Sequence, residues 1–206
     1  MKKLFLSSSF VDVAKYFADF VKEAVKGKSV TFIPTASNTE SYTAYVDKDK
    51  GAFKELGIAV HLLDVSISSK EQIQEAVDKH DYIYVSGGNT FYLLQELRAS
   101  GADHIISNAV TSGKVYIGAS AGSVVMAPDI AYLQLMDDIS QATELENFKG
   151  LGLVDFFPIP HHTNEPFKQA VEAILLQFNA KIPLVAISNT EVIQVEGEGY
   201  SIYGNK

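Results

Sequence analysis

A strand-to-helix turn in the second half of the chain constrains the fold more than any other feature. The apolar run Val115-Tyr116-Ile117 leads into Gly118-Ala119-Ser120-Ala121-Gly122-Ser123, and Val124-Val125-Met126 follow. A G-x-S-x-G turn in this setting is typical of a nucleophile elbow, in which glycines permit a sharp bend and one serine stands above the sheet edge. Ser120 is therefore the candidate nucleophile. The alternative is an ordinary turn in which Ser120 caps the helix.

Apolar runs alternate with amphipathic stretches along most of the chain. Strands are expected at Lys3–Leu6, Val30–Ile33, Ala59–Leu63, Tyr82–Val85, Val115–Ile117, Val154–Ile159 and Leu184–Ile187. Helices are expected at Val11–Val25, Tyr42–Leu56, Lys70–Lys79, Thr90–Arg98, His104–Thr111 and Pro166–Phe178. This order predicts an α/β fold with a doubly wound, mostly parallel sheet and helices on both faces. The last two apolar runs, Val192–Val195 and Tyr200–Tyr203, predict a C-terminal β-hairpin.

Composition narrows the class of protein. At 206 residues, without a repeat, low-complexity tract or linker, residues 1–206 are expected to form a single domain. A net charge of −8 argues against binding to nucleic acid, and the absence of cysteine excludes disulfides and thiolate chemistry. The apolar start Leu4-Phe5-Leu6 is too short for a signal peptide, and no stretch approaches the ~20 apolar residues of a membrane span. We expect a cytoplasmic protein that binds neither nucleic acid nor membrane.

A catalytic serine needs a base, and that base is usually histidine. His161 and His162 follow the predicted strand Val154–Ile159. Because catalytic groups in open parallel sheets collect at the C-terminal ends of the strands, one of these two histidines is expected near Ser120. Three other histidines are expected to be ordinary surface or half-buried side chains: His61, His80 and His104.

The loop Ser86-Gly87-Gly88-Asn89 offers further parts of a site, because it too lies between a predicted strand and helix. A tetrahedral intermediate needs about two preorganised N–H donors. The N–H groups of Ala121 and Gly88 are the candidates, and Asn89 is a candidate substrate contact.

Residues 127–150 are long for a connection, so this segment is expected to be functional or mobile. It supplies the candidate acids that could orient the imidazole. Asp137 and Asp138 stand between Ser120 and the histidines, and Glu144 and Glu146 are alternatives.

Four short motifs together resemble the S51 family of serine peptidases, which contains aspartyl dipeptidase (peptidase E) and cyanophycinase. In chain order, they are Ser86-Gly87-Gly88-Asn89-Thr90, Gly118-Ala119-Ser120-Ala121-Gly122-Ser123, Gly150-Leu151-Gly152-Leu153 and Pro160-His161. The resemblance covers nearly the whole chain and implies a fold like that of class I glutamine amidotransferases, with serine in place of the cysteine nucleophile.

By motif position, the resemblance implies roles for six residues. They are Ser120 as nucleophile, His161 as base, Asp137 as the acid with Asp138 as second choice, and Gly88 and Ala121 as oxyanion donors. The implied activity is a serine peptidase of the dipeptidase type, acting on short peptides without a metal or organic cofactor. The sequence is compatible with both a monomer and a homodimer. The rivals are a hydrolase of isopeptide or ester substrates, and a catalytically silent binding or regulatory domain.

The sequence departs from the family pattern at two points. His162 stands where members usually have an aromatic residue, so the two histidines could exchange roles. No arginine follows Arg98, whereas aspartyl dipeptidases use a later arginine to hold the acidic side chain of the substrate. Lys149 and Lys168 are poor substitutes, because lysine lacks the planar fork of arginine. A strict preference for Asp-X dipeptides is therefore not expected.

Overall fold

A seven-stranded sheet forms the centre of the protein, for which a computed structural model describes residues 1–204. Its strands are β1 (Lys3–Ser7), β2 (Ser29–Ile33), β3 (Ala59–Leu62), β4 (Tyr82–Val85), β5 (Val115–Ala119), β8 (Glu191–Glu196) and β9 (Gly199–Gly204). They lie in the order β3-β2-β4-β5-β1-β8-β9. The first five pair in parallel, whereas β8 and β9 form an antiparallel hairpin joined to β1. The predicted α/β fold and terminal hairpin are confirmed.

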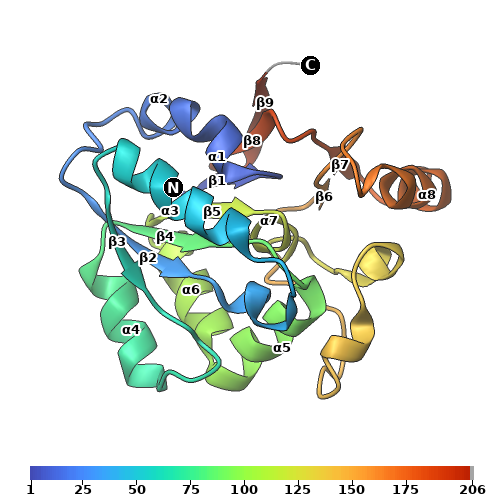
Figure 1. Ribbon diagram of the computed structural model, residues 1–206, viewed down its shortest axis with the longest axis horizontal. Coiled ribbons are helices and arrows are strands. Elements are labelled where there is room, and N and C mark those ends of the chain that lie inside the picture. The colour runs from blue at the N-terminus through green and yellow to red at the C-terminus, as the bar shows by residue number, and fades with distance from the viewer. Residues whose placement is uncertain (205–206) are drawn as a thin grey trace.

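Helices cover both faces of this sheet (Figure 1). They are α1 (Phe10–Val13), α2 (Phe17–Val21), α3 (Ala44–Glu55), α4 (Lys70–Lys79), α5 (Thr90–Ser100), α6 (Ala102–Thr111), α7 (Ala121–Val124) and α8 (Lys168–Phe178). The first three lie on one face and α4 to α6 on the other. Successive side chains of β4 point to opposite faces of the sheet, so the strand contributes to two hydrophobic cores. Tyr82 and Tyr84 belong to one core, and Ile83 and Val85 belong to the other. Within residues 1–204, the structure has no helix with the length and apolar character of a membrane span.

The single helix predicted over Val11–Val25 is wrong. A 3₁₀ turn at Ala14–Tyr16 separates α1 from α2, and Lys22 ends α2 in the left-handed region with φ 59°. This path surrounds Phe5 of β1 with three rings whose centroids lie 5.5 to 6.3 Å away: Phe10, Phe17 and Phe20. Aromatic packing against the sheet therefore outweighs the helical period of the sequence.

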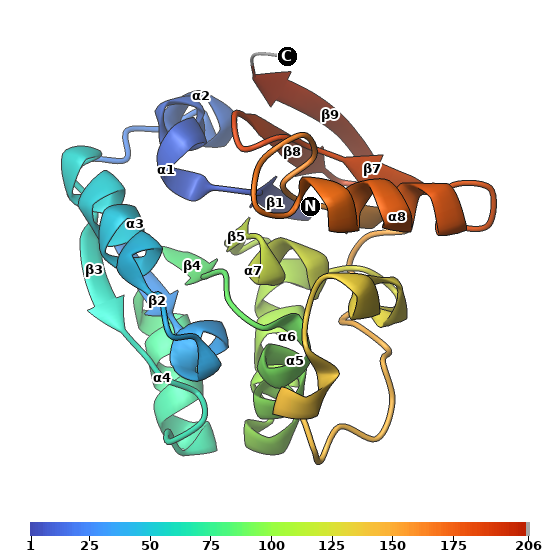
Figure 2. The same cartoon turned by 45° about the vertical axis from the view of Figure 1, so that its right-hand side comes forward.

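A second, two-stranded parallel sheet stands apart from the first. It consists of β6 (Phe157–Ile159) and β7 (Leu184–Ala186), with α8 between them in the chain. In Figure 2, β7 and α8 lie to one side of the large sheet. The strand expected at Val154–Ile159 is therefore three residues shorter, and it pairs with β7 rather than extending the large sheet. The residues that follow β6 are therefore positioned by the two-stranded sheet and not by the large one.

Residues 127–150 have defined local structure. They contain the 3₁₀ helices η3 (Ala131–Leu135) and η4 (Ile139–Gln141). Arg98, the only arginine of the chain, donates from Nη1 to the carbonyl oxygen of Asn147 at 2.7 Å and also binds the carbonyl oxygen of Lys149. The guanidinium is thereby engaged in holding this segment against α5.

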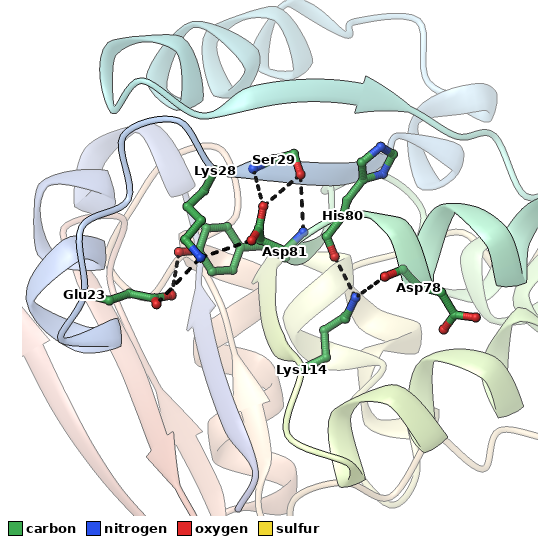
Figure 3. A network of polar contacts seen from close by, with 8 residues as sticks. Glu23, Lys28, Ser29, Asp78, His80, Asp81 and Lys114 are labelled. Carbon is green, nitrogen blue, oxygen red and sulfur yellow. Dashed lines mark hydrogen bonds and ion pairs between the residues drawn. The ribbon is translucent and has the colours of Figure 1, made fainter.

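A polar network lies at the N-terminal ends of β2 and β4, at the end of the large sheet away from Ser120 (Figure 3). Asp81 accepts hydrogen bonds from the N–H of Ser29 at 2.8 Å and from Lys28 Nζ at 3.1 Å. Lys114 Nζ donates to the carbonyl oxygens of Asp78 and His80 at 3.3 and 2.6 Å, which satisfies acceptors left free where α4 ends. These contacts stabilise the fold at the edge remote from the elbow.

One buried carboxyl group lies between α3 and the sheet. Asp49 is only 4% exposed, and it accepts hydrogen bonds from the hydroxyl of Tyr84 and the N–H of Val11. Burial raises the pKa of Asp49 to about 6, partly offset by these hydrogen bonds.

Replacing Asp49 with asparagine is expected to remove a pH-dependent loss of stability. Because ionisation of Asp49 is harder in the folded chain than in the unfolded one, the free energy of unfolding falls as pH rises from about 4 to about 6. A pKa displaced from 3.8 to about 6 corresponds to roughly 3 kcal/mol. Urea unfolding at pH 4 and pH 7 measures the difference between wild type and Asp49→Asn, and an equal difference at both pH values would contradict the expectation.

Candidate active site

Ser120 occupies a strained position between β5 and α7. Its backbone has φ 48° and ψ −110°, a combination that costs a non-glycine residue about 1–3 kcal/mol and is typical of functional turns. Two donors bind one carbonyl oxygen, that of Ser7, to hold the turn: the N–H of Ser120 at 2.9 Å and Oγ of Ser123 at 2.8 Å. This sharp turn between a strand and a helix is the kind of bend on which the nucleophile-elbow prediction depends.

The elbow is packed too closely for side chains at two glycines. A Cβ at Gly122 would lie 2.1 Å from the carbonyl oxygen of Val85, so α7 lies directly against β4. Gly88 has φ 135°, and a Cβ there would lie 2.1 Å from the carbonyl oxygen of Ala36. The preceding Gly87 lies beside Ser120, since a Cβ at Gly87 would be 3.2 Å from that of Ser120. The Gly-Gly loop and the turn at Ser120 therefore face each other.

His161 brings its imidazole to the elbow from the small sheet. Its Nε2 lies 2.9 Å from Ser120 Oγ. The residue has φ 62°, and its ring stacks on Phe167 with centroids 4.6 Å apart. His162 instead donates its backbone N–H to the carbonyl oxygen of Ile187 at 3.0 Å. Of the two adjacent histidines, the structure thus places His161 against the serine.

Asn189 holds the other side of the imidazole. Its Oδ1 lies 2.8 Å from His161 Nδ1, and its own backbone N–H donates to Asn164 Oδ1 at 2.9 Å. Because an amide oxygen only accepts, Nδ1 carries the proton and Nε2 presents a lone pair to Ser120. Burial lowers the pKa of His161 below its usual value of 6.5, and the bond to Asn189 partly opposes this. The imidazole is therefore neutral at neutral pH.

The structure does not bring the expected acids to this imidazole. Asp137 Oδ2 accepts a hydrogen bond from the N–H of Thr90 at 2.8 Å, so Asp137 lies at the start of α5, and burial raises its pKa to about 6. Asp138 is exposed and caps η4 through Ser140 at 2.8 and 2.9 Å, which lowers its pKa. Neither aspartate is therefore the orienting acid that the sequence predicts. The free N–H at the start of α5 binds the carboxylate of Asp137, and the cap of η4 binds that of Asp138.

Asn89 also differs from its expected role. Its Oδ1 accepts the N–H of Tyr92 at 2.9 Å as the N-cap of α5, and its Nδ2 donates to the carbonyl oxygen of Asp138 at 2.8 Å. The side chain is 3% exposed. With both ends of its amide bound to the protein, Asn89 ties residues 127–150 to the loop at residues 86–89 rather than offering a substrate contact.

Comparison with known proteins places the chain among the peptidases. The model of peptidase family S51 matches residues 4–203. The chain belongs to this family. Peptidase family S51 comprises hydrolytic enzymes, so the protein is a peptidase.

Individual relatives agree with this assignment. The chain is 46% identical over 198 residues to an uncharacterised peptidase of Listeria monocytogenes, with 96% of each chain covered. It is 32% identical over 222 residues to a peptidase E of a Nostoc species, covering all of this chain and 87% of the relative. A crystal structure of a Listeria monocytogenes protein provisionally named peptidase E superposes with a TM-score of 0.95 at 44% identity, over 100% of both chains. This peptidase therefore shares its fold with that Listeria protein over the whole of both chains.

Proposed function

We propose that this S51 peptidase is a serine peptidase that hydrolyses short peptides through an acyl-enzyme on Ser120, with His161 as general base. One observation carries the proposal: Ser120 Oγ and His161 Nε2 lie 2.9 Å apart, with the second ring nitrogen bound to Asn189. Nucleophile, base and orienting group in this order form the arrangement that activates a serine hydroxyl.

The reaction follows from these positions. His161 Nε2 takes the hydroxyl proton while Ser120 Oγ attacks the carbonyl carbon of the scissile bond. The N–H groups of Ala121 and Gly88 stabilise the oxyanion that forms. Within residues 1–204, neither group donates to another backbone carbonyl, so both are available. The imidazolium returns its proton to the leaving amine, and water, deprotonated by the same imidazole, then releases the acid and restores Ser120.

The charges near the site disfavour an acidic substrate side chain. Tyr45 Oη lies 3.4 Å from the carbonyl oxygen of Gly87, and Glu40 and Asp137 both raise the pKa of Tyr45 through their charge, after the larger effect of burial. Arg98 is already bound to residues 147 and 149. We therefore propose that the enzyme does not share the Asp-X preference of aspartyl dipeptidases.

A fluorophosphonate probe tests the serine mechanism, because it labels an activated serine covalently. Wild type is expected to be labelled at Ser120, and Ser120→Ala is expected to stay unlabelled. A dipeptide library, with isopeptide and ester substrates added, then identifies the bond that is cleaved. A wild type that resists the probe under conditions that label a control hydrolase would favour the catalytically silent alternative. Efficient cleavage of casein would count against a preference for short peptides.

Replacing Asn189 with aspartate is expected to move the acidic limb of the pH profile upward. A carboxylate beside Nδ1–H favours the imidazolium, so the pKa of His161 rises. The enzyme then loses its neutral base at a higher pH. The pH dependence of kcat/KM for wild type and Asn189→Asp measures the effect, and Asn189→Ala, which removes the acceptor, is the companion variant. Identical limbs in wild type and Asn189→Asp would show that Asn189 does not govern the base.

A further inference from the structure

The nucleophile and the base stand on different sheets. Ser120 follows β5 of the large sheet, whereas His161 follows β6 of the small one. The 2.9 Å contact between them therefore depends on how the two sheets are joined. The backbone of His161 adds to this dependence, since φ 62° is unfavourable for a non-glycine residue and needs an anchor.

Ser8 lies at this junction, immediately after β1, and is 3% exposed. Its Oγ accepts a hydrogen bond from the N–H of His161 at 3.0 Å and donates to the carbonyl oxygen of Ile187 at 3.0 Å. His161 comes shortly after β6, and Ile187 directly after β7. One hydroxyl therefore ties both strands of the small sheet to the end of β1.

The preceding residue holds the nucleophile. The carbonyl oxygen of Ser7 accepts the N–H of Ser120 and Oγ of Ser123, and Ser7 Oγ donates to the carbonyl oxygen of Gly118 at 2.9 Å. Two consecutive residues of one chain segment thus fix the two halves of the site, Ser7 the elbow and Ser8 the histidine loop.

We propose that Ser8 is a positioning residue, which holds His161 at hydrogen-bond distance from Ser120. The inference rests on the proposed function, in which those two side chains react. Ser8 acts through the backbone of His161, so its effect should appear in the geometry and titration of the imidazole and not in substrate affinity. A displacement of about 1 Å between reacting groups can cost on the order of 100-fold in rate.

Ser8→Ala tests this directly, because it removes both hydrogen bonds and little volume. We expect kcat to fall about 10- to 100-fold while KM stays within about threefold. Burial now lowers the pKa of His161, so a loosened imidazole is expected to titrate higher and to move the acidic limb of kcat/KM upward. An unchanged kcat and pH profile would overturn the proposal.

Two readouts separate this inference from the proposed function. The rate of fluorophosphonate labelling reports the activation of Ser120 without any peptide substrate, and it should fall by the same factor as kcat. An NMR titration of the His161 imidazole reports its pKa without any reaction, so it serves even if the wild type neither cleaves peptides nor reacts with the probe. A higher pKa in Ser8→Ala supports the positioning role, and an equal pKa rejects it.

Thr31→Val is the matched control. Thr31 is fully buried in β2, and its hydroxyl also makes two hydrogen bonds, to the carbonyl oxygen of Ala76 at 2.8 Å and to His80 Nδ1 at 2.9 Å. This variant should lose stability but keep the wild-type kcat and pH profile. Equal losses of activity in both variants would overturn the proposal. If Ser8→Ala does not fold, Ser8→Cys carries the same readouts with smaller effects, because a thiol is a weak donor and acceptor of similar shape.

Discussion

Alanine at Ser120 or at His161 is expected to lower kcat by about 10⁴-fold or more, and the double variant is expected to lose no more than either single variant. The reason is the 2.9 Å contact between the two side chains. Without the imidazole the hydroxyl keeps its proton, and without the hydroxyl the imidazole has nothing to activate. The test is a double-mutant cycle: kcat is measured for wild type, the two single variants and the double variant on a substrate found in the dipeptide library.

His162→Ala is the control for these variants, because it removes the neighbouring imidazole, whereas the hydrogen bond to the serine comes from His161. It should retain most of the wild-type kcat. Independent, multiplicative losses from Ser120→Ala and His161→Ala would mean that the two residues do not act as a unit. A strong loss in His162→Ala would return the role of base to the second histidine.

Gly88→Ala is expected to destabilise the protein by about 3–5 kcal/mol and to abolish labelling of Ser120 in any protein that still folds. The new Cβ would lie 2.1 Å from the carbonyl oxygen and 2.2 Å from the carbonyl carbon of Ala36, at φ 135°. Both neighbours are backbone atoms, so no side chain can rotate away. Movement of the loop would also displace the N–H proposed as an oxyanion donor. Thermal unfolding and probe labelling measure the two effects.

Gly51→Ala is the control that separates crowding from the mere loss of a glycine. Gly51 lies within α3, and a Cβ there would meet nothing within 4 Å. Alanine at this position should raise stability by about 0.5–1 kcal/mol. If Gly88→Ala unfolds at the wild-type temperature and is labelled at the wild-type rate, the close approach of the loop to Ala36 is not essential.

The approach of His161 to Ser120 follows from a rule that sequence alone can apply. The rule places catalytic groups at the C-terminal ends of parallel strands. Each of the two residues follows a recognisable apolar run, although the two runs form strands of different sheets. The same rule could have found Asn189, which comes two residues after the predicted strand Leu184–Ile187. A single asparagine in a turn, however, carries no motif, and Asp137 is the more conventional residue type for an orienting acid.

The other predictions that the structure corrects depend on the three-dimensional path of the chain, which the order of residues does not determine. Asp137 stands between the nucleophile and the base in the chain, but the path of residues 127–150 takes it to the N–H of Thr90. The 3₁₀ turn at Ala14–Tyr16 interrupts the predicted helix, and the rings of α2 then pack against Phe5 of β1. A helical period does not reveal this contact with another element. Likewise, a short strand such as β6 has the same apolar pattern whether it joins the large sheet or a separate pair.

The placement of the base on a two-stranded unit has a consequence for how this protein fails when it is warmed. Most helices pack on the large sheet, so circular dichroism at helical wavelengths follows that part of the molecule. In the proposed mechanism, by contrast, turnover requires β6 and β7, which have three residues each, to stay packed against the large sheet. We therefore expect inactivation to precede melting on heating, so that a heat-treated sample keeps its helical spectrum after it has lost activity.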